Sequence, residues 1–318
     1  MRPAWAILAA ALALAAARPL RAGASVSAAY LLRGVSPQED ALGQCALAAD
    51  QSPAELWRNP AAQGGTGLAL THGLGPLGGD VEYAAAELSW GRQSLGFQGF
   101  YQGDSDTFRD DLGQIGASFT DQESLLGLAY ALGLGNASVG AGVKVLGESL
   151  AGQQADPGVL ADLGCLWRFW GRRVQLSLAA QNLGIAPHWA GSPQYSPATL
   201  GLSAREALGA AGRLRMYQDA RLVLPMAPSG VATQGAPVLG GLGLEWALPT
   251  PSLPVFLRVG YAQGDNQPSG AYGVSAGFGL AWQKLGFDYA FTSLGDLGAS
   301  NRLGLSWDFG PGPAAGAL

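Results

Sequence analysis

The chain has 318 residues, of which only 13% are charged, whereas glycine accounts for 49 residues and aromatic side chains for 9%. Soluble proteins carry about 25% charged residues, so this composition lacks the charge that an ordinary water-exposed surface needs. The formal charge of −5 argues against nucleic acid as a partner. After residue 24, no run approaches the ~18 uninterrupted apolar residues of a membrane-spanning helix, which argues against a helical membrane protein.

The first 24 residues have the pattern of an export signal. Arg2 precedes an apolar run over 4–17, and the residues that end at Ala24 form a small-residue cleavage pattern. The apolar run is too short for a stable anchor, so we expect cleavage between Ala24 and Ser25. Cleavage would remove three arginines and take the formal charge from −5 to −8.

The next segment, 25–65, shows no regular alternation of apolar and polar residues. From Glu39-Asp40-Ala41-Leu42 to Asn59-Pro60-Ala61 it has the composition of turns with one or two helical stretches. A barrel of about fourteen strands has a wider lumen than an eight-stranded barrel, whose interior is filled by side chains. A segment of this size could fill that wider lumen.

From residue 66 onward the sequence alternates with a period of two. Leu303, Leu305, Trp307 and Phe309, for example, are large and apolar, and the residues between them are small or polar. A β-strand places alternate residues on opposite faces, so each such run predicts a strand with one apolar face. Turn residues divide the runs into these predicted strands: 66–72, 80–90, 93–102, 122–133, 136–147, 157–170, 172–183, 197–206, 212–225, 236–248, 253–263, 269–283, 285–293 and 299–309.

Two folds share this pattern, a membrane barrel and a soluble sandwich or lipocalin-like barrel. A soluble sheet points its apolar face at a common core and exposes its charges. Here the apolar face recurs over about a dozen strands while the other face carries glycine and few charges, so lipid is the better solvent. Closure also removes the unpaired edges that lipid does not tolerate. We therefore predict an all-β fold, a transmembrane antiparallel β-barrel of about fourteen strands over 66–309, in a bacterial outer membrane.

The predicted connections alternate in length. Short links such as 91–92, 171–172 and 283–284 contrast with longer ones at 103–121, 184–196 and 226–235. This alternation is typical of barrels in which one rim faces the periplasm and the other faces the outside.

The register that turns large apolar residues towards lipid turns the charged residues inwards. The cations outnumber the anions, so the lumen could carry a positive potential that binds an anionic head group or an acidic plug. Alternatively, these charges only satisfy one another. The predicted lumen-facing charges are Lys144, Arg168, Arg173, Arg205, Arg213, Arg215, Arg221, Arg258, Arg302 and Asp288, together with Asp162, Asp219, Glu245 and Asp308.

The last predicted strand carries the candidate signal for the barrel assembly machinery, which would be a partner. Outer-membrane barrels usually end on an aromatic residue, but here nine further residues, 310–318, follow Phe309. We expect Leu305, Trp307 and Phe309 to form the recognition strand and the proline- and glycine-rich tail to be disordered.

Residue types that carry catalysis are scarce. His72 and His188 are the only histidines, and the chain has no Gly-x-Ser-x-Gly elbow, no His-Glu-x-x-His and no Cys-x-x-Cys. We therefore predict no enzymatic activity, no metal site and no cofactor. Cys45 and Cys165 could form a bridge in an oxidising periplasm, but their spacing alone does not decide this.

Several short motifs resemble the PorV/PorQ family of FadL-like outer-membrane barrels. They cover both ends and the middle of the chain after residue 24, and their order is more specific than any one of them. The motifs are 48–54 running into Leu56-Trp57-Arg58-Asn59-Pro60-Ala61, then Gln181-Asn182-Leu183-Gly184, Leu257-Arg258-Val259-Gly260-Tyr261, Asp288-Tyr289-Ala290-Phe291, Gly295-Asp296-Leu297-Gly298 and Arg302.

This resemblance implies a fourteen-stranded barrel whose segment 25–65, with the turn Asn59-Pro60-Ala61, folds into the lumen as a hatch. It implies no catalytic residues. It leaves two functions open, passive transport of small hydrophobic or amphipathic molecules and a PorV-like role as a type IX secretion partner that receives secreted protein cargo. A structural barrel without transport is the third possibility.

The sequence departs from the family at three places: Arg58 stands where an aromatic residue is usual, the loop at 103–121 is short compared with that of the family, and a tail follows Phe309. A short loop weakens the protein-docking interpretation, because docking requires exposed surface. The expected partners are therefore outer-membrane lipid, the assembly machinery, and either hydrophobic small molecules or secreted cargo.

Overall fold

The computed structural model describes residues 28–49, 52–62, 65–75, 79–109, 113–189, 195–209, 212–224, 238–250, 253–263, 273–295 and 298–310, apart from the side chain of residue 109. The predicted signal peptide, its cleavage point between Ala24 and Ser25, and residues 311–318 of the predicted tail lie outside this range. None of the helices within these ranges is long and apolar enough to cross a membrane.

The described chain starts with four short helical turns and continues as strands. The turns are η1 (Ala29–Leu32), α2 (Pro37–Ala41), η2 (Pro53–Trp57) and η3 (Pro60–Ala62). The strands are β1 (Gly67–Leu74), β2 (Asp80–Trp90), β3 (Gln93–Arg109), β4 (Ile115–Leu134), β5 (Ala137–Leu150), β6 (Gln153–Gln154), β7 (Gly158–Phe169), β8 (Val174–Ile185), β9 (Thr199–Leu208), β10 (Leu214–Val223), β11 (Val238–Ala247), β12 (Val255–Gln263), β13 (Val274–Trp282), β14 (Leu285–Ser293) and β15 (Ala299–Asp308).

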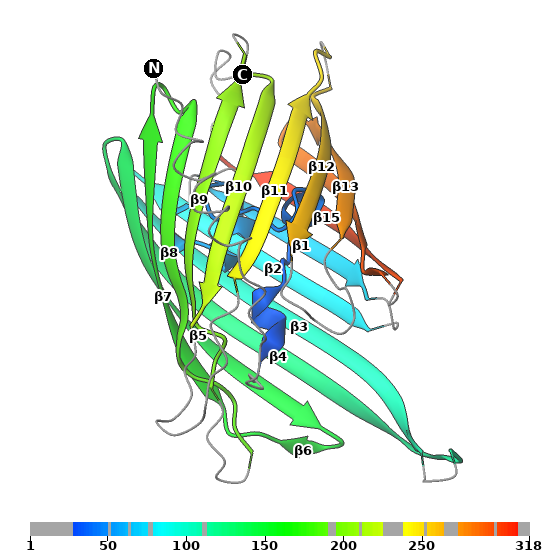
Figure 1. Cartoon of the computed structure of the whole chain (residues 1–318). Coiled ribbons are helices and arrows are strands. Elements are labelled where there is room, and N and C mark those ends of the chain that lie inside the picture. Colours follow the sequence, from blue (N-terminus) through cyan, green and yellow to red (C-terminus); the bar gives the residue numbers. More distant parts are fainter. Residues whose placement is uncertain are drawn as a thin grey trace.

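The strands form one closed antiparallel barrel (Figure 1). Neighbours in sequence pair with each other, and β1 pairs with β15 from Gly67 opposite Asp308 to Leu74 opposite Asn301, which closes the sheet. The two-residue strand β6 only extends the end of β5, so β5 pairs onward with β7 and the barrel wall has fourteen strands. The predicted fold class is confirmed, and each predicted strand corresponds to one strand of the wall.

Burial alternates along the strands, as the period of two predicts. On β7, for example, Leu160 and Leu166 are buried whereas Val159, Leu163 and Trp167 are exposed. The exposed apolar side chains recur around the outer face on most of the strands, including Leu70, Phe97, Leu126, Leu178, Leu244, Val259, Phe291 and Leu305. An outer face of this kind is suited to lipid and not to water.

The two ends of the barrel differ in their connections. One end holds the tight turns at 91–92 and 283–284, together with the start of β1 and the end of β15. The other, which we call the long-loop end, holds longer connections such as 186–198 between β8 and β9. This difference matches the predicted alternation of short and long links.

The prediction of a loop at 103–121 is wrong. β3 continues to Arg109 and β4 begins at Ile115, so most of this stretch is a long hairpin that projects past the other strands (Figure 1). Asp104, Ser105, Asp106 and Thr107 lack the apolar alternation of the other strands. Because a strand beyond the lipid has water on both sides, it needs no apolar face.

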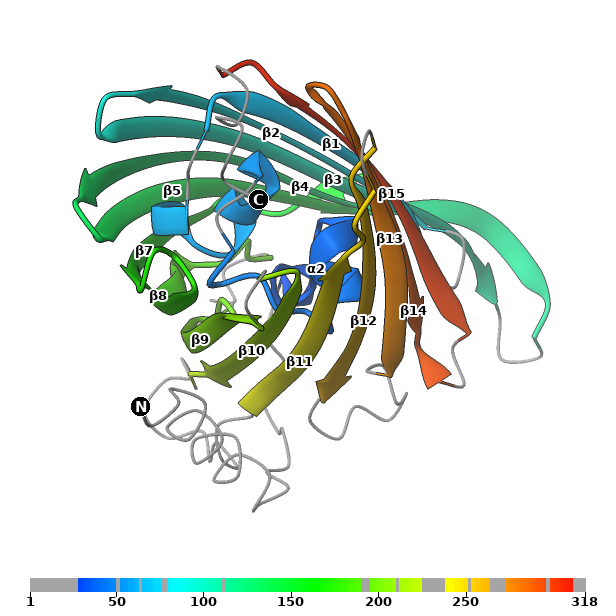
Figure 2. The ribbon, with the colours of Figure 1, turned by 90° about the horizontal axis from the view of Figure 1, so that it is seen from above.

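The described parts of the N-terminal segment, residues 28–49 and 52–62, lie inside the ring of strands (Figure 2). α2 contacts β12 to β15, η2 contacts β1 to β3, and η3 contacts β4, β5 and β7. The segment therefore touches opposite sides of the wall. Capping by serine stabilises its short turns: Ser36 Oγ accepts a hydrogen bond from Glu39 N at 3.1 Å, and Ser52 forms a capping box with Glu55.

Candidate functional site

The turn Asn59-Pro60-Ala61 joins the N-terminal segment to the wall. The Asn59 amide donates to Leu47 O at 2.9 Å and to Ser177 Oγ of β8 at 2.7 Å, and its Oδ1 accepts from Ala61 N at 2.9 Å. Asn59 is fully buried, and these three bonds satisfy an amide that would otherwise be costly to bury. A further wall group, Ser138 Oγ of β5, donates to Ala61 O at 2.8 Å.

A carboxylate of β10 holds the middle of the segment. Asp219 Oδ2 accepts hydrogen bonds from the backbone N–H groups of Ala46 and Leu47 at 3.1 and 3.2 Å, and Oδ1 accepts from Ser203 of β9. The alternation of residues predicted that Asp219 faces the lumen but not which groups it binds. Its partners are backbone N–H groups of a segment that has no periodic pattern. Asp219 is therefore an anchor and not only one member of a charge network.

Many of the charges predicted to face the lumen lie in ion pairs. The pairs join wall strands that are adjacent or one strand apart, join the wall to the N-terminal segment or, for Arg58 with Glu39, lie within that segment, which favours the interpretation in which the charges satisfy one another. The pairs, with their N···O distances, are Arg302 with Asp40 (2.8 Å), Lys144 with Asp162 (2.7 Å), Arg215 with Glu245 (2.7 Å), Arg258 with Glu245 (2.8 Å), Arg258 with Asp288, and Arg58 with Glu39 (2.5 Å).

The remaining predicted lumen charges have mixed positions. Arg205 and Arg221 are buried, and Arg221 Nη1 donates to Leu32 O of the segment at 3.2 Å. Arg168 is half-buried and donates to Ser138 Oγ at 3.2 Å. The inward prediction is wrong for Arg173 and Arg213, which are exposed just before β8 and β10, because these strands start two residues later than the alternation suggested. Asp308 keeps its strand position but is exposed at the end of β15.

Glycines on the inner face let the segment approach the wall closely. A Cβ on Gly164 of β7 would meet Asn59 Oδ1, and one on Gly140 of β5 would lie 2.5 Å from the backbone of Pro60. Real side chains do not tolerate such contacts, so a larger residue would displace the segment. The inner-face glycines are thus part of the contact surface.

Arg58, which stands where the family usually has an aromatic residue, links parts of the N-terminal segment to one another. Its Nε binds Glu39, and its Nη atoms donate to Leu31 O at 3.2 Å and Leu32 O at 3.0 Å. Beside this pair, burial raises the pKa of Asp40 to about 6, although the positive charge of Arg302 opposes the shift. The segment therefore contains a carboxyl group that titrates near neutral pH.

A chamber of about 180 Å³ lies between the segment and the wall at the long-loop end. Tyr30, Phe100, Val81 and Leu74 give it an apolar and aromatic side, and the rest of the lining includes the charged side chains of Arg33, Asp40 and Arg302. The Tyr30 and Phe100 rings stack at 4.9 Å between centroids with parallel planes. The sequence could not reveal this chamber, because Tyr30 lies in the stretch without alternation.

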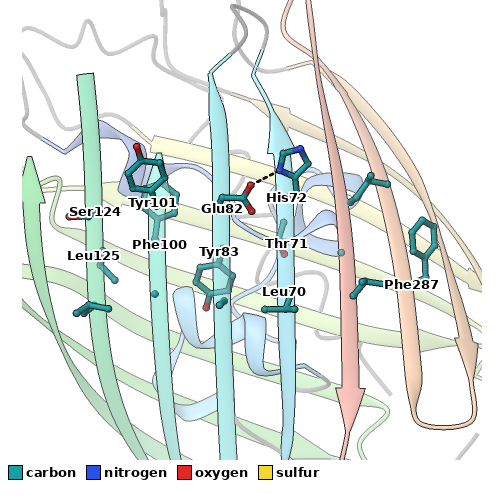
Figure 3. A pocket seen from close by; sticks show the side chains of 16 residues that line it. Leu70, Thr71, His72, Glu82, Tyr83, Phe100, Tyr101, Ser124, Leu125 and Phe287 are labelled. Carbon is teal, nitrogen blue, oxygen red and sulfur yellow. Dashed lines mark hydrogen bonds and ion pairs between the residues drawn. The ribbon is translucent and has the colours of Figure 1, made fainter. Parts of the chain in front are cut away.

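The outer face of the wall carries an apolar groove of about 840 Å³ across β14, β15 and β1 to β4 (Figure 3). Leu70 and Phe287 line it, and His72 Nδ1 lies 2.6 Å from Glu82 Oε1 at its edge. Behind the groove, β1 and β2 pair without a register shift, so the groove does not open through the wall there. The groove is therefore a feature of the lipid-facing side. The second histidine, His188, lies 3.4 Å from Asp156 between β8 and β9.

The predicted assembly strand is β15. Leu305 and Trp307 are exposed on its outer face, and Phe309 follows it with its ring 5.1 Å from that of Trp307. Phe309 N also donates to Thr66 O at 2.7 Å, which fixes the end of the barrel to its beginning. Within the described ranges, no three His, Cys, Asp or Glu side chains come together as metal ligands, and Cys45 and Cys165 are both free.

Several solved structures share this barrel. The toluene transporter TbuX of Ralstonia pickettii is 15% identical with a TM-score of 0.64, and the match covers 88% of this chain and 100% of that chain. The CymD monoaromatic hydrocarbon channel is 14% identical with a TM-score of 0.61, and the match covers 88% of this chain and 99% of that chain. A Pseudomonas aeruginosa FadL homologue is 14% identical with a TM-score of 0.59, and the match covers 87% of this chain and 99% of that chain. The chain therefore has the fold of FadL homologues.

No protein-family model and no curated protein matches the sequence. The likeness therefore comes from structure and shows the shared fold. The finer assignment to the PorV/PorQ group stays a prediction.

Proposed function

We propose that this protein is an outer-membrane channel for passive uptake of small hydrophobic molecules, with the N-terminal segment as its hatch. The observation that carries the proposal is the chamber between the segment, which contributes Tyr30, and the wall, which contributes Phe100. This chamber lies inside a barrel whose outer face is apolar. A cavity of about 150 Å³ is large enough to hold benzene. The chamber, at about 180 Å³, has room for a molecule of that class.

The printed names of the structures with the same fold support this substrate class. TbuX is a toluene transporter and CymD is a monoaromatic hydrocarbon channel. Both are spanned almost completely by the match, so the likeness includes the whole barrel and not one part of it.

The contacts of the segment suggest how passage is controlled. Polar anchors such as Asn59 and Asp219 hold the segment across the lumen, so a molecule in the chamber passes only when part of the segment moves. Each neutral hydrogen bond contributes about 1 kcal/mol, which makes local release of a few anchors accessible without unfolding the barrel.

A reversible crosslink between the segment and the wall tests this function. Ala61→Cys with Ser138→Cys replaces a pair in hydrogen-bond contact, in a background with Cys45→Ser and Cys165→Ser. We expect proteoliposomes with a lipopolysaccharide outer leaflet to take up naphthalene when the bridge is reduced and to stop when it is oxidised. Each single-cysteine variant is the control. Equal uptake in both states and in protein-free vesicles would indicate a barrel without transport.

One observation favours the secretion-partner alternative. The β3–β4 hairpin projects from the long-loop end and exposes Phe108 and Ile115. Such a surface could receive a protein domain, and it removes the objection that 103–121 is too short for docking. Binding of a purified cargo signal domain to the intact barrel, lost on Phe108→Ser with Ile115→Ser, would support this second candidate.

A further inference from the structure

Basic side chains gather in the links at the end of the barrel opposite the long-loop end. This end, which we call the tight-turn end, holds the links 91–92, 135–136, 170–173, 209–213, 248–254 and 283–284. Four of these six links contain arginine or lysine, and none contains an acid. Their basic side chains are all exposed, and we call them the basic turns: Arg92, Arg172, Arg173, Arg213 and Lys284.

The links at the long-loop end have the opposite composition. Their sequences contain no arginine or lysine, whereas aspartate occurs in 110–114, 151–157, 264–273 and 294–298. The basic turns are therefore not the result of a generally basic chain, since the formal charge of the whole chain is −5. The positive charge is confined to the links of one end.

The acids that the structure describes near the basic turns do not match them in number at the surface. Glu87 and Glu245 are buried, Glu206 is half-buried, and Asp308 is exposed. Lys284 Nζ donates to Gly310 O at 3.1 Å, a backbone group that leaves the charge of the ammonium uncompensated. The described surface of the tight-turn end is therefore net positive.

Tryptophans beside the basic turns are a second, independent observation. Trp90, Trp170 and Trp282 each stand two residues before a member of the basic turns, and Trp246 pairs with Leu214, which follows Arg213. Tryptophan on a membrane protein is enriched at the level of the lipid head groups. The exposed tryptophans of this end are Trp90, Trp167, Trp170, Trp246, Trp282 and Trp307. The basic turns therefore lie at or just beyond the head-group level.

The chemistry of these side chains fits a phosphate group. The arginine guanidinium can bind two phosphate oxygens at once, and lysine binds phosphate as a point charge. The short turns of an outer-membrane barrel face the periplasm, on the side of the phospholipid leaflet. A zwitterionic head group carries its own cation beside its phosphate, whereas an anionic head group has a net charge that basic residues near the membrane surface attract.

We propose that the basic turns bind the head groups of anionic phospholipids such as phosphatidylglycerol and concentrate these lipids around the tight-turn end. The tryptophans set the depth of the barrel, and the arginines and lysine of the turns then reach the phosphate groups. Neither the chamber nor the N-terminal segment takes part, so the binding does not depend on the proposed channel function.

Quenching of tryptophan fluorescence by brominated lipids tests this binding, because six exposed tryptophans lie at the tight-turn end. The full chain carries Trp189→Phe, which removes the half-buried tryptophan of the long-loop end. It is reconstituted into phosphatidylcholine vesicles that contain acyl-brominated phosphatidylglycerol or acyl-brominated phosphatidylcholine. We expect an affinity about fivefold higher for phosphatidylglycerol at low salt, the effect of one basic residue at an anionic surface. In ~1 M salt, where the Debye length is ~3 Å, this preference should disappear.

Arg92→Gln with Arg213→Gln and Lys284→Gln should lower the preference to about twofold or less. Arg92→Lys with Arg213→Lys keeps the charges and should retain it. Asp80→Asn with Asp156→Asn, at exposed acids of the long-loop end, changes the net charge elsewhere and should have no effect. Heat-modifiable migration in gels shows that each variant is a folded barrel. Equal affinity of the parent chain for the two lipids, or an unchanged preference in the glutamine variant, would overturn the proposal.

Discussion

Two parts of the lumen wall, the anchoring half from β5 to β12 and the apolar half from β2 to β4, meet the N-terminal segment in different ways. From β5 to β12 the wall contacts the segment through hydrogen-bonding side chains such as Ser177 and Asp219, and through glycines that let backbone approach backbone. From β2 to β4 it presents Tyr83, Phe100 and Leu125, which pack on the rings of the segment. The first half fixes position, whereas the second half supplies a surface on which another apolar molecule could replace existing contacts.

This difference suggests why both halves would be needed in the proposed channel. Hydrogen bonds and close backbone contacts depend steeply on geometry, so they hold the segment in one place. Apolar contacts are less directional and tolerate exchange of partners. The chamber borders Phe100 on one side and the Arg302–Asp40 ion pair on the other, so a substrate of the proposed channel would meet both kinds of contact.

The largest effect should come from the anchoring half. Asp219→Ala removes the acceptor of two buried backbone N–H groups and the carboxylate beside Arg221. We expect docking of the segment to lose about 3 kcal/mol, since unsatisfied buried groups are left behind. Hydrogen exchange of 41–49 should accelerate while the strands stay protected. Asp156→Ala, at an exposed carboxylate, is the control, and unchanged exchange in Asp219→Ala would contradict the division into halves.

A smaller effect is expected from Gly164→Ala, because its Cβ would meet Asn59 Oδ1. Overpacking of this kind costs about 1 to 3 kcal/mol. The matched variant is Gly99→Ala, whose Cβ would have only a side-chain atom of Leu126 within reach, at 3.7 Å. Limited proteolysis of the segment should speed up in the first variant and not in the second. If both behave alike, close approach to the wall does not hold the segment.

Substitution in the apolar half should leave the segment docked. Phe100→Leu removes the stacked ring on Tyr30, a contribution of about 1 kcal/mol, and enlarges the chamber. We expect naphthalene uptake to change while hydrogen exchange of 41–49 stays as in the unaltered protein. Faster exchange there would show that the apolar half also anchors.

The smallest effect concerns pH. The docked Asp40 has a pKa of about 6, above its ordinary 3.8, so the docked state binds the proton more tightly. This contribution is complete below the ordinary value and is lost as pH rises through 6. Docking should therefore be about 1 kcal/mol stronger at pH ~5 than at pH ~7.5. Protease protection of the segment reports it, and Asp40→Asn should remove the dependence. Protection that rises with pH would contradict the assignment.

The barrel wall could be predicted from sequence because lipid on one side enforces a strict period of two. The predicted strand 299–309 and the observed β15 (Ala299–Asp308) differ by one residue. The same reasoning failed at 103–121, where β3 and β4 continue past the lipid. There water is on both sides, so Asp104 and Thr107 carry no alternation that would mark a strand.

The interior of the site was harder to predict. Arg302 and Gly34 are 268 positions apart, and their hydrogen bond exists only because the barrel closes around the segment. The inward register of Arg302 could be inferred from its strand, but Asp40, Arg58 and Tyr30 lie in a stretch where no period assigns a face. Their partners follow from three-dimensional contact and not from local pattern.

The reactivity of the Cys45 thiol can report movement of the segment away from the wall. Its side chain is 1% exposed, next to Gly241 of β11, and Cys165 of β7 is not bonded to it. Burial, and then the charge of Asp219, raise the pKa of the Cys45 thiol, so the thiolate that reagents attack is rare while the segment is docked. In a Cys165→Ser background, the rate at which an added reagent alkylates Cys45 would report how often the segment leaves the wall.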